Sequence, residues 1–231
     1  MKFIFKPLSV ALAGTLLVGC ASKSPNVDLS SAFWKNHKQV VVVAHNKIVP
    51  PQLYKGGDQG LIDILINDAV SNRLQSYLGK LKPDVTQQLN AQFIKRFNAK
   101  HIAAKSYTKT IDTSKLPSDD RDNKKYAVKK FTALKMAVGS DKLLIVSVNA
   151  LGVERKYMGF IPLGAPRAVC NLSGKLVDLN SNKILWRHNF NSTVSVKGPW
   201  DQPPRYKNLT IALNKAIVDS SQNMLDQFFQ G

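Results

Sequence analysis

The chain has 231 residues and a formal net charge of +18, from 33 Lys and Arg against 15 Asp and Glu. This length suffices for one sizeable domain with its own core. The charge favours polyanionic partners. With only two cysteines, Cys20 and Cys170, the sequence excludes a disulfide-dense scaffold. After residue 20, no apolar stretch approaches the roughly 20 residues that a transmembrane helix needs.

The N-terminus has the pattern of a secretory signal peptide. Lys2 and Lys6 supply a charged start, and a short apolar run from Leu8 to Val18 follows. The run is too short to span a bilayer stably as a helix, where about 20 apolar residues are needed. The segment therefore predicts export rather than membrane spanning.

The signal segment ends in Leu17-Val18-Gly19-Cys20, which resembles the lipobox of bacterial lipoproteins. The resemblance implies cleavage before Cys20 and acylation of that cysteine. Ala21 rather than Asp follows, which by the same resemblance favours the outer membrane, with the domain facing the periplasm. The alternative is an ordinary cleaved signal peptide with Cys20 left free. We expect a signal peptide at 1–19, a lipidated cysteine and flexible tether at 20–32, and one domain at 33–231.

The positive charge is concentrated in residues 95–142, which hold 13 Lys and Arg against 5 Asp. A lipid anchor would remove nucleic acid as a partner and leave envelope polyanions such as lipopolysaccharide, peptidoglycan or exopolysaccharide. We expect Lys124, Lys125, Lys129 and Lys130 to form a polyanion-binding set. The alternative is that these lysines only confer solubility.

The first half of the chain predicts alternating strands and helices. Val40–Ala44 is a continuous β-branched run, typical of a buried strand. A helix is expected at about 61–78, a second from Pro83-Asp84, and a short strand at 101–107. In the first helix we expect an apolar stripe of Leu61, Ile62, Leu65, Ala69 and Leu74, and a polar face of Asp63, Asn67, Ser71 and Gln75.

The second half predicts a helix, a meander of strands and a final helix. A polar loop at 109–123 precedes a helix at about 123–138, ended by Gly139. Strands follow at 143–148, 168–179 and 183–197. In the last strand Ile184, Trp186, His188 and Phe190 should face the core. The final helix should turn Tyr206, Leu209, Leu213, Ile217 and Met224 inward.

These elements predict an α/β (α+β) fold: a single mixed sheet of about five strands flanked by helices, with a C-terminal helix. The stretch Asp141–Val148, then Gly174–Leu179, a polar turn and Lys183–Trp186 resembles envelope lipoproteins with the fold of the TolB N-terminal domain. That group includes lipoproteins of curli secretion, Pel exopolysaccharide export and peptidoglycan-synthase activation. The resemblance implies the fold and no specific site.

Motifs for catalysis, phosphate loops and metal binding are absent from the sequence. The four histidines are not spaced along the chain as the ligands of a zinc ion usually are. Cys170 is expected to be a buried apolar residue rather than a nucleophile. We therefore expect no catalytic residue, no metal and no cofactor. A hydrolase whose catalytic pair comes from distant positions is the residual alternative.

Residues 154–167 are apolar, aromatic and rich in Gly and Pro, which predicts a loop or hairpin tip. We expect a protein-contact patch there, with a basic rim. The patch and rim are Tyr157, Phe160, Ile161, Leu163, Arg155 and Arg167. Alternatively, the loop folds back and buries Phe160 and Ile161.

Together these features favour a non-enzymatic outer-membrane lipoprotein that is an accessory or scaffold in a secretion, export or cell-wall assembly. Its expected partners are the membrane, through lipid, and other envelope proteins. Binding of an anionic glycan or lipid is the alternative function. The sequence is also compatible with a homo-oligomer.

Overall fold

The computed structural model describes residues 25–46, 48–121 and 123–230. The predicted signal peptide and Cys20 lie outside these residues. The helices are α1 (Ser31–Trp34), α2 (Leu61–Lys80), α3 (Val85–Ala99), α4 (Lys135–Val138) and α5 (Lys207–Phe229), with 3-10 turns at Thr113–Lys115 and Phe131–Leu134. The strands are β1 (Val40–His45), β2 (Gln52–Asp58), β3 (Ala103–Ser106), β4 (Lys142–Met158), β5 (Ile161–Pro162), β6 (Arg167–Asp178) and β7 (Ile184–Ser195).

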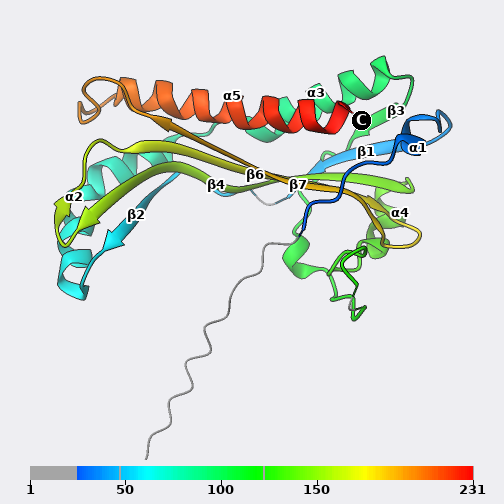
Figure 1. The fold of residues 1–231 in the computed structure, drawn as a ribbon, viewed down its shortest axis with the longest axis horizontal. Helices are drawn as coiled ribbons and strands as arrows, with labels where there is room; N and C mark the ends of the chain where they lie inside the picture. The colour runs from blue at the N-terminus through cyan, green and yellow to red at the C-terminus, as the bar shows by residue number, and fades with distance from the viewer. Residues whose placement is uncertain (1–24, 47, 122, 231) are drawn as a thin grey trace, which may run out of the picture.

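All strands belong to one mixed sheet with the order β3-β1-β4-β6-β7 (Figure 1). The early strands β1 and β3 are parallel, whereas β4, β6 and β7 form an antiparallel meander. In Figure 1, α3 and α5 lie above the sheet and the segment around α4 lies below its right half. The predicted fold class, one mixed sheet flanked by helices with a C-terminal helix, is confirmed.

The main core lies between the sheet and helices α3 and α5. Phe93, Phe97 and Phe228 are fully buried there, and Trp186 packs edge-on against Phe228 with the ring centroids 4.7 Å apart. The residues expected to face inward at the final helix, from Tyr206 to Met224, are buried, and α3 buries Val85, Leu89, Phe93 and Phe97. Such edge-to-face packing adds to the stabilisation from burial.

A smaller core occupies the opposite face, beneath residues 107–138. It includes Phe131, Val177 and Ile184. Ile184 therefore does not share a face with Trp186, although the two are two positions apart in the strand. A register shift between Leu176 and Val177 in the β6–β7 ladder inserts one extra residue and turns Ile184 over.

The prediction of a helix at about 123–138 is wrong. Only Lys135–Val138 is α-helical, and Phe131–Leu134 is a 3-10 turn. Residues before it form isolated bridges, Ser118 with Lys129 and Tyr126 with Lys183. Ala127, Phe131 and Val138 are nevertheless buried, because tertiary contacts to the β6–β7 turn override the helical pattern.

Strand β2 is absent from the sequence prediction, because it contains Gly56-Gly57 and glycine is depleted in strands. It pairs with the second half of β4, from Gln52 opposite Gly152 to Asp58 opposite Met158. A side chain at Gly152 would bring its Cβ within 1.9 Å of the Gln52 carbonyl oxygen, and one at Gly57 within 2.0 Å of that of Tyr157. Both glycines also have positive φ, so here they permit close strand pairing.

The predicted face of α2 is also wrong. Leu61, Ile62 and Leu65 are 85%, 74% and 69% exposed, whereas Asn67 and Ser71 are buried. Only the C-terminal half follows the pattern, with Leu74 in the main core. The first two turns of α2 therefore present their apolar side chains to solvent.

Gly174 leaves the space that Trp186 fills, because a Cβ at Gly174 would lie 2.3 Å from the indole ring. We expect Gly174→Ala to lower the free energy of unfolding by about 1–3 kcal/mol, the usual cost of overpacking a core. Chemical denaturation measures the change. Gly79→Ala is the control, because a Cβ at Gly79 would meet no atom within 4 Å. This substitution should raise the free energy of unfolding, since Ala has a higher helix propensity than Gly. Equal effects of the two substitutions would contradict the packing argument.

Candidate functional site

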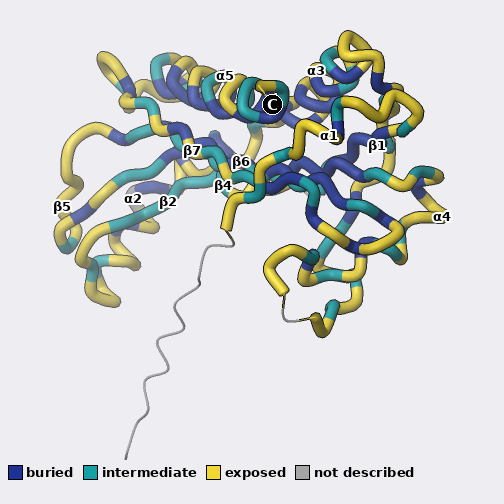
Figure 2. Tube along the Cα trace, turned by 45° about the vertical axis from the view of Figure 1, so that its right-hand side comes forward, coloured by how far each residue is buried: buried dark blue, intermediate teal, exposed yellow. Residues whose placement is uncertain are grey.

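Exposed apolar side chains gather where α2 begins and where β4 turns into β5. At the β4–β5 turn, Met158, Phe160, Ile161 and Leu163 are between 50% and 60% exposed. Figure 2 shows this turn as an exposed segment at one end of the molecule. The predicted patch therefore does not fold back onto the sheet.

Polar contacts join the start of α2 to this turn. The Asn67 amide Nδ2 donates to the Gly159 carbonyl oxygen at 3.1 Å and to Gln59 Oε1 at 2.8 Å. The Ser71 and Tyr157 hydroxyls are 3.4 Å apart. Burying the polar face of α2 against the turn satisfies these groups and forces the apolar face outward. This explains why α2 is turned against its sequence pattern.

We call the resulting surface the apolar end. It consists of two groups of exposed side chains, Leu61, Ile62 and Leu65 on α2 and Met158, Phe160, Ile161 and Leu163 at the turn, on either side of the polar contacts of Asn67 and Ser71. Groups of large apolar side chains that face water commonly mark interaction sites. The α2 half of this surface was missed in the sequence because its residues were assigned to the core.

Other members of the predicted patch have structural contacts. Tyr157 is 3% exposed and supports the apolar end from beneath. The Arg155 guanidinium lies over the Trp200 ring, 4.4 Å from its centroid, and Arg167 pairs with Glu154 at 2.8 Å. Lys156 is exposed beside them and supplies positive charge to the rim.

The segment that carries the four predicted polyanion-binding lysines, residues 123–130, lies on the side of α4, away from the β4–β5 turn (Figures 1 and 2). Lys124, Lys125 and Lys130 are exposed, whereas Lys129 is half-buried with Nζ 3.5 Å from Ser118 Oγ. Three of the four predicted lysines are therefore exposed on this segment.

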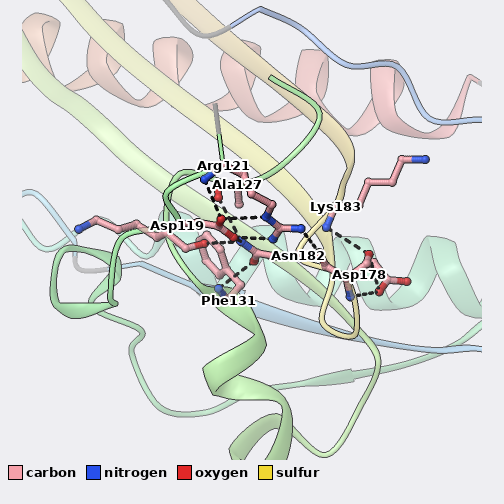
Figure 3. Close-up of polar contacts among 9 residues, drawn as sticks. Asp119, Arg121, Ala127, Phe131, Asp178, Asn182 and Lys183 are labelled. Atoms are coloured by element: carbon pink, nitrogen blue, oxygen red, sulfur yellow. Dashed lines mark hydrogen bonds and ion pairs between the residues drawn. The ribbon is translucent and has the colours of Figure 1, made fainter. Parts of the chain in front are cut away.

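Asn182, in the β6–β7 turn, holds that segment in place (Figure 3). Its Nδ2 donates to the carbonyl oxygens of Ala127 and Lys129 at 3.1 and 2.9 Å, and its Oδ1 accepts from the Phe131 amide at 2.9 Å. Nδ2 also donates to Asp119 at 2.7 Å. These bonds replace helical ones, which accounts for the missing helix.

Arg121 is the second partner of Asp119. Hydrogen bonds from Arg121 and Asn182 hold the pKa of the Asp119 carboxyl well below its usual range. The ionised Asp119 carboxylate therefore stabilises the folded segment at pH values above about 4, the pKa of an Asp carboxyl in an unfolded chain. This stabilisation is lost as the pH falls below about 4 toward the lower pKa of the folded state. The acidic cluster at 119–122 therefore has a structural role at Asp119.

Groups with catalytic potential are few in the described ranges. Burial raises the pKa of the Cys170 thiol to about 12, so it is not an activated nucleophile. No group of three or more His, Cys, Asp or Glu in residues 25–46, 48–121 and 123–230 is arranged to hold a metal ion. Across the same residues, none of the helices combines the length and apolarity that crossing a bilayer requires.

No family model matches the chain, and no curated protein matches it either. Several solved structures are similar to it. A protein of Xanthomonas campestris from family DUF330 is 12% identical, covers 81% of each chain and has a TM-score of 0.40. The PelC dodecamer of Paraburkholderia phytofirmans is 10% identical over 82% of this chain and 87% of that one, with a TM-score of 0.35. The lipoprotein GNA1162 of Neisseria meningitidis is 15% identical over 79% of this chain and 99% of that one, with a TM-score of 0.29. Of these three structures, GNA1162 is described as a lipoprotein.

Proposed function

We propose that this protein is a lipid-anchored, non-catalytic envelope lipoprotein that acts as an accessory or scaffold in an outer-membrane secretion, export or cell-wall assembly. The observation that carries the proposal is the apolar end. Its seven exposed apolar side chains are backed by a satisfied polar layer of Asn67 and Ser71. A rigid, water-facing apolar surface of this kind fits a protein partner.

The expected partner is another envelope protein with an apolar contact surface. The margin of the apolar end carries both signs of charge, because Lys156 and Asp58 are both exposed there and the Asp63 carboxylate lies beside Gly159. Apolar burial rather than net charge would therefore drive the contact.

The lipid anchor would fix the distance of the domain from its membrane. Pro25, Val27 and Asp28 contact β7, including a Val27 amide to Arg187 carbonyl hydrogen bond of 2.9 Å. Only the residues between Cys20 and Pro25 would then separate lipid from domain. At about 3.5 Å per extended residue, they span at most about 17 Å. The apolar end would be presented to partners at the same membrane.

We expect Cys20→Ser to abolish membrane attachment. A single acyl chain binds a membrane only marginally and two or more bind it stably, so removal of the acylated sulfur should move the protein to the soluble fraction. Membrane fractionation and the intact mass of the mature chain measure the effect. An unmodified wild-type mass would contradict the lipoprotein assignment, and the contact surface could still be tested separately.

We expect the double substitution Phe160→Ser with Ile161→Ser to reduce recovery of the partner at least tenfold, since buried aromatic anchors dominate interface energies. Quantitative co-purification from detergent-extracted membranes measures this. The matched control is Ile211→Ser with Val218→Ser, which removes two exposed apolar side chains from α5, 56% and 64% exposed. Unchanged recovery with the first pair, or equal loss with the second, would contradict the proposal. Circular dichroism checks that both variants fold.

A second candidate function is binding of an anionic glycan or lipid by the lysine segment. It is favoured by the exposure of Lys124, Lys125 and Lys130 on one held segment. Exposed charges interact through screened electrostatics, so affinity for lipopolysaccharide should fall steeply between low and physiological salt. Salt-independent binding, or binding unaffected by replacing all three lysines with Gln, would exclude this candidate.

A further inference from the structure

One half of the sheet face opposite α3 and α5 is not covered by the 107–138 segment and forms a groove. Its cavity volume is about 760 Å³, within the range of about 300–1,000 Å³ that is usual for ligand sites. Its lining includes Tyr54 of β2, Glu154 of β4, and Thr113 and Phe131 of the 107–138 segment. Strands β4, β6 and β7 form the floor.

The floor of this groove carries two cations directly opposite each other. Lys175 on β6 is in register with Arg187 on β7, and both line the groove. Like charges at such positions destabilise a sheet, because their Cβ atoms are only about 4.5–5.5 Å apart. Burial, and secondarily the neighbouring Arg187 charge, lowers the pKa of the Lys175 ammonium. The fold therefore holds two positively charged side chains, Lys175 and Arg187, that repel each other.

Nothing among the described residues neutralises this pair. The only acidic residue lining the groove is Glu154, and its carboxylate pairs with Arg167 at 2.8 Å. The Lys175 ammonium lies over the Phe131 ring, 5.2 Å from its centroid. A ring face is a weaker partner for an ammonium than a carboxylate.

Arg187 is also incompletely hydrogen-bonded. It is 7% exposed, and its Nε donates to the Pro25 carbonyl oxygen at 2.8 Å. Its buried Nη2 has no hydrogen-bond partner in the part of the chain that the structure describes. A buried charged donor without an acceptor is costly, so an anion placed beside it would recover a strong interaction.

Besides the two cations and the apolar Ile145, Ala150 and Val169, the groove is lined by a set of neutral polar side chains. They come from alternate positions of the three strands, which all point to this face. They are Ser147, Asn149, Asn171, Ser173, Asn189, Asn191 and Thr193. Carboxamides and hydroxyls can each donate and accept, as the vicinal hydroxyls of a sugar require.

We propose that this groove binds a saccharide that carries an anionic group. The carboxylate or phosphate lies between Lys175 and Arg187, and the sugar hydroxyls bond to Asn171, Asn189 and Asn191. This site is separate from the exposed lysine segment and from the apolar end. It goes beyond the scaffold role proposed above and does not depend on it.

The test is calorimetric titration of the full-length protein in detergent. The charged probes are trigalacturonate, which carries carboxylates, and glucose 6-phosphate; maltotriose and inorganic phosphate are the controls. We expect at least one charged probe to bind and maltotriose to bind at least tenfold more weakly. Which charged probe binds distinguishes a carboxylate from a phosphate ligand. Binding of neither charged probe, or inorganic phosphate binding as tightly as the phosphorylated sugar, would overturn the proposal.

The decisive variant is Lys175→Met, with Lys95→Met as the control for an equal change in charge, since Lys95 is exposed on α3 and belongs to neither candidate site. Lys175→Met should weaken binding of the charged probe at least tenfold, and Lys95→Met should change it less than twofold. Removing the repulsive, partly buried charge should also raise the melting temperature of the Lys175 variant by about 2–4 °C. A more stable variant that has lost binding excludes misfolding as the cause. Unchanged binding by Lys175→Met, or an equal loss with Lys95→Met, would overturn the proposal.

Discussion

The structure depends on the hydrogen bonding of one long central strand. β4 has 17 residues, against about 5–6 for a common strand, and pairs with β1 along its first part and with β2 along its second. On its other edge it pairs with β6 along nearly its whole length. Helices α3 and α5 cover one face of this sheet, but on the opposite face the 107–138 segment covers only half. The excess length of β4 therefore creates both the groove and the apolar end.

A β-bulge in β4 prepares the floor of the groove. The register with β6 shifts between Val148 and Ala150, so Asn149 and Ala150 both line the groove whereas Val148 and Leu151 remain in the main core. Bulges re-aim side chains in this way next to functional sites. The same strand then continues to the turn that carries Phe160, so one element positions both candidate surfaces.

The sequence predicted those elements whose own pattern agrees with their packing. β1 is a run of valines buried on both faces, and α3 and α5 bury the apolar stripes that their spacing indicates. These segments make most of their contacts with the main core, so local pattern and tertiary environment coincide. The mixed sheet and the C-terminal helix followed directly from them.

The failures occurred where distant side chains decided the local structure. Asn182 supplies the hydrogen bonds that residues 127–131 would otherwise make within a helix, and it lies more than 50 positions away in the chain. Asn67 turns α2 by bonding to the carbonyl oxygen of Gly159, 92 positions away. Strand β2 was missed because Gly57 lies directly against Tyr157 of β4, 100 positions away in the chain, and no local pattern indicates that pairing. Periodicity describes one segment at a time and contains none of this information.

The candidate surfaces share a physical property that distinguishes them from the rest of the fold. At the apolar end, Leu61 and Phe160 face water although the chain has a large core that could have taken them. In the groove, Lys175 and Arg187 face each other although an acidic residue at either position would have formed a cross-strand ion pair. Each arrangement lowers the stability of the isolated chain, and local rules are broken in this way mainly at functional sites. A partner protein would remove water from the first surface, and an anionic ligand would neutralise the second. Because the two defects differ in chemistry and are carried by different parts of the sheet, they fit two ligands of different classes.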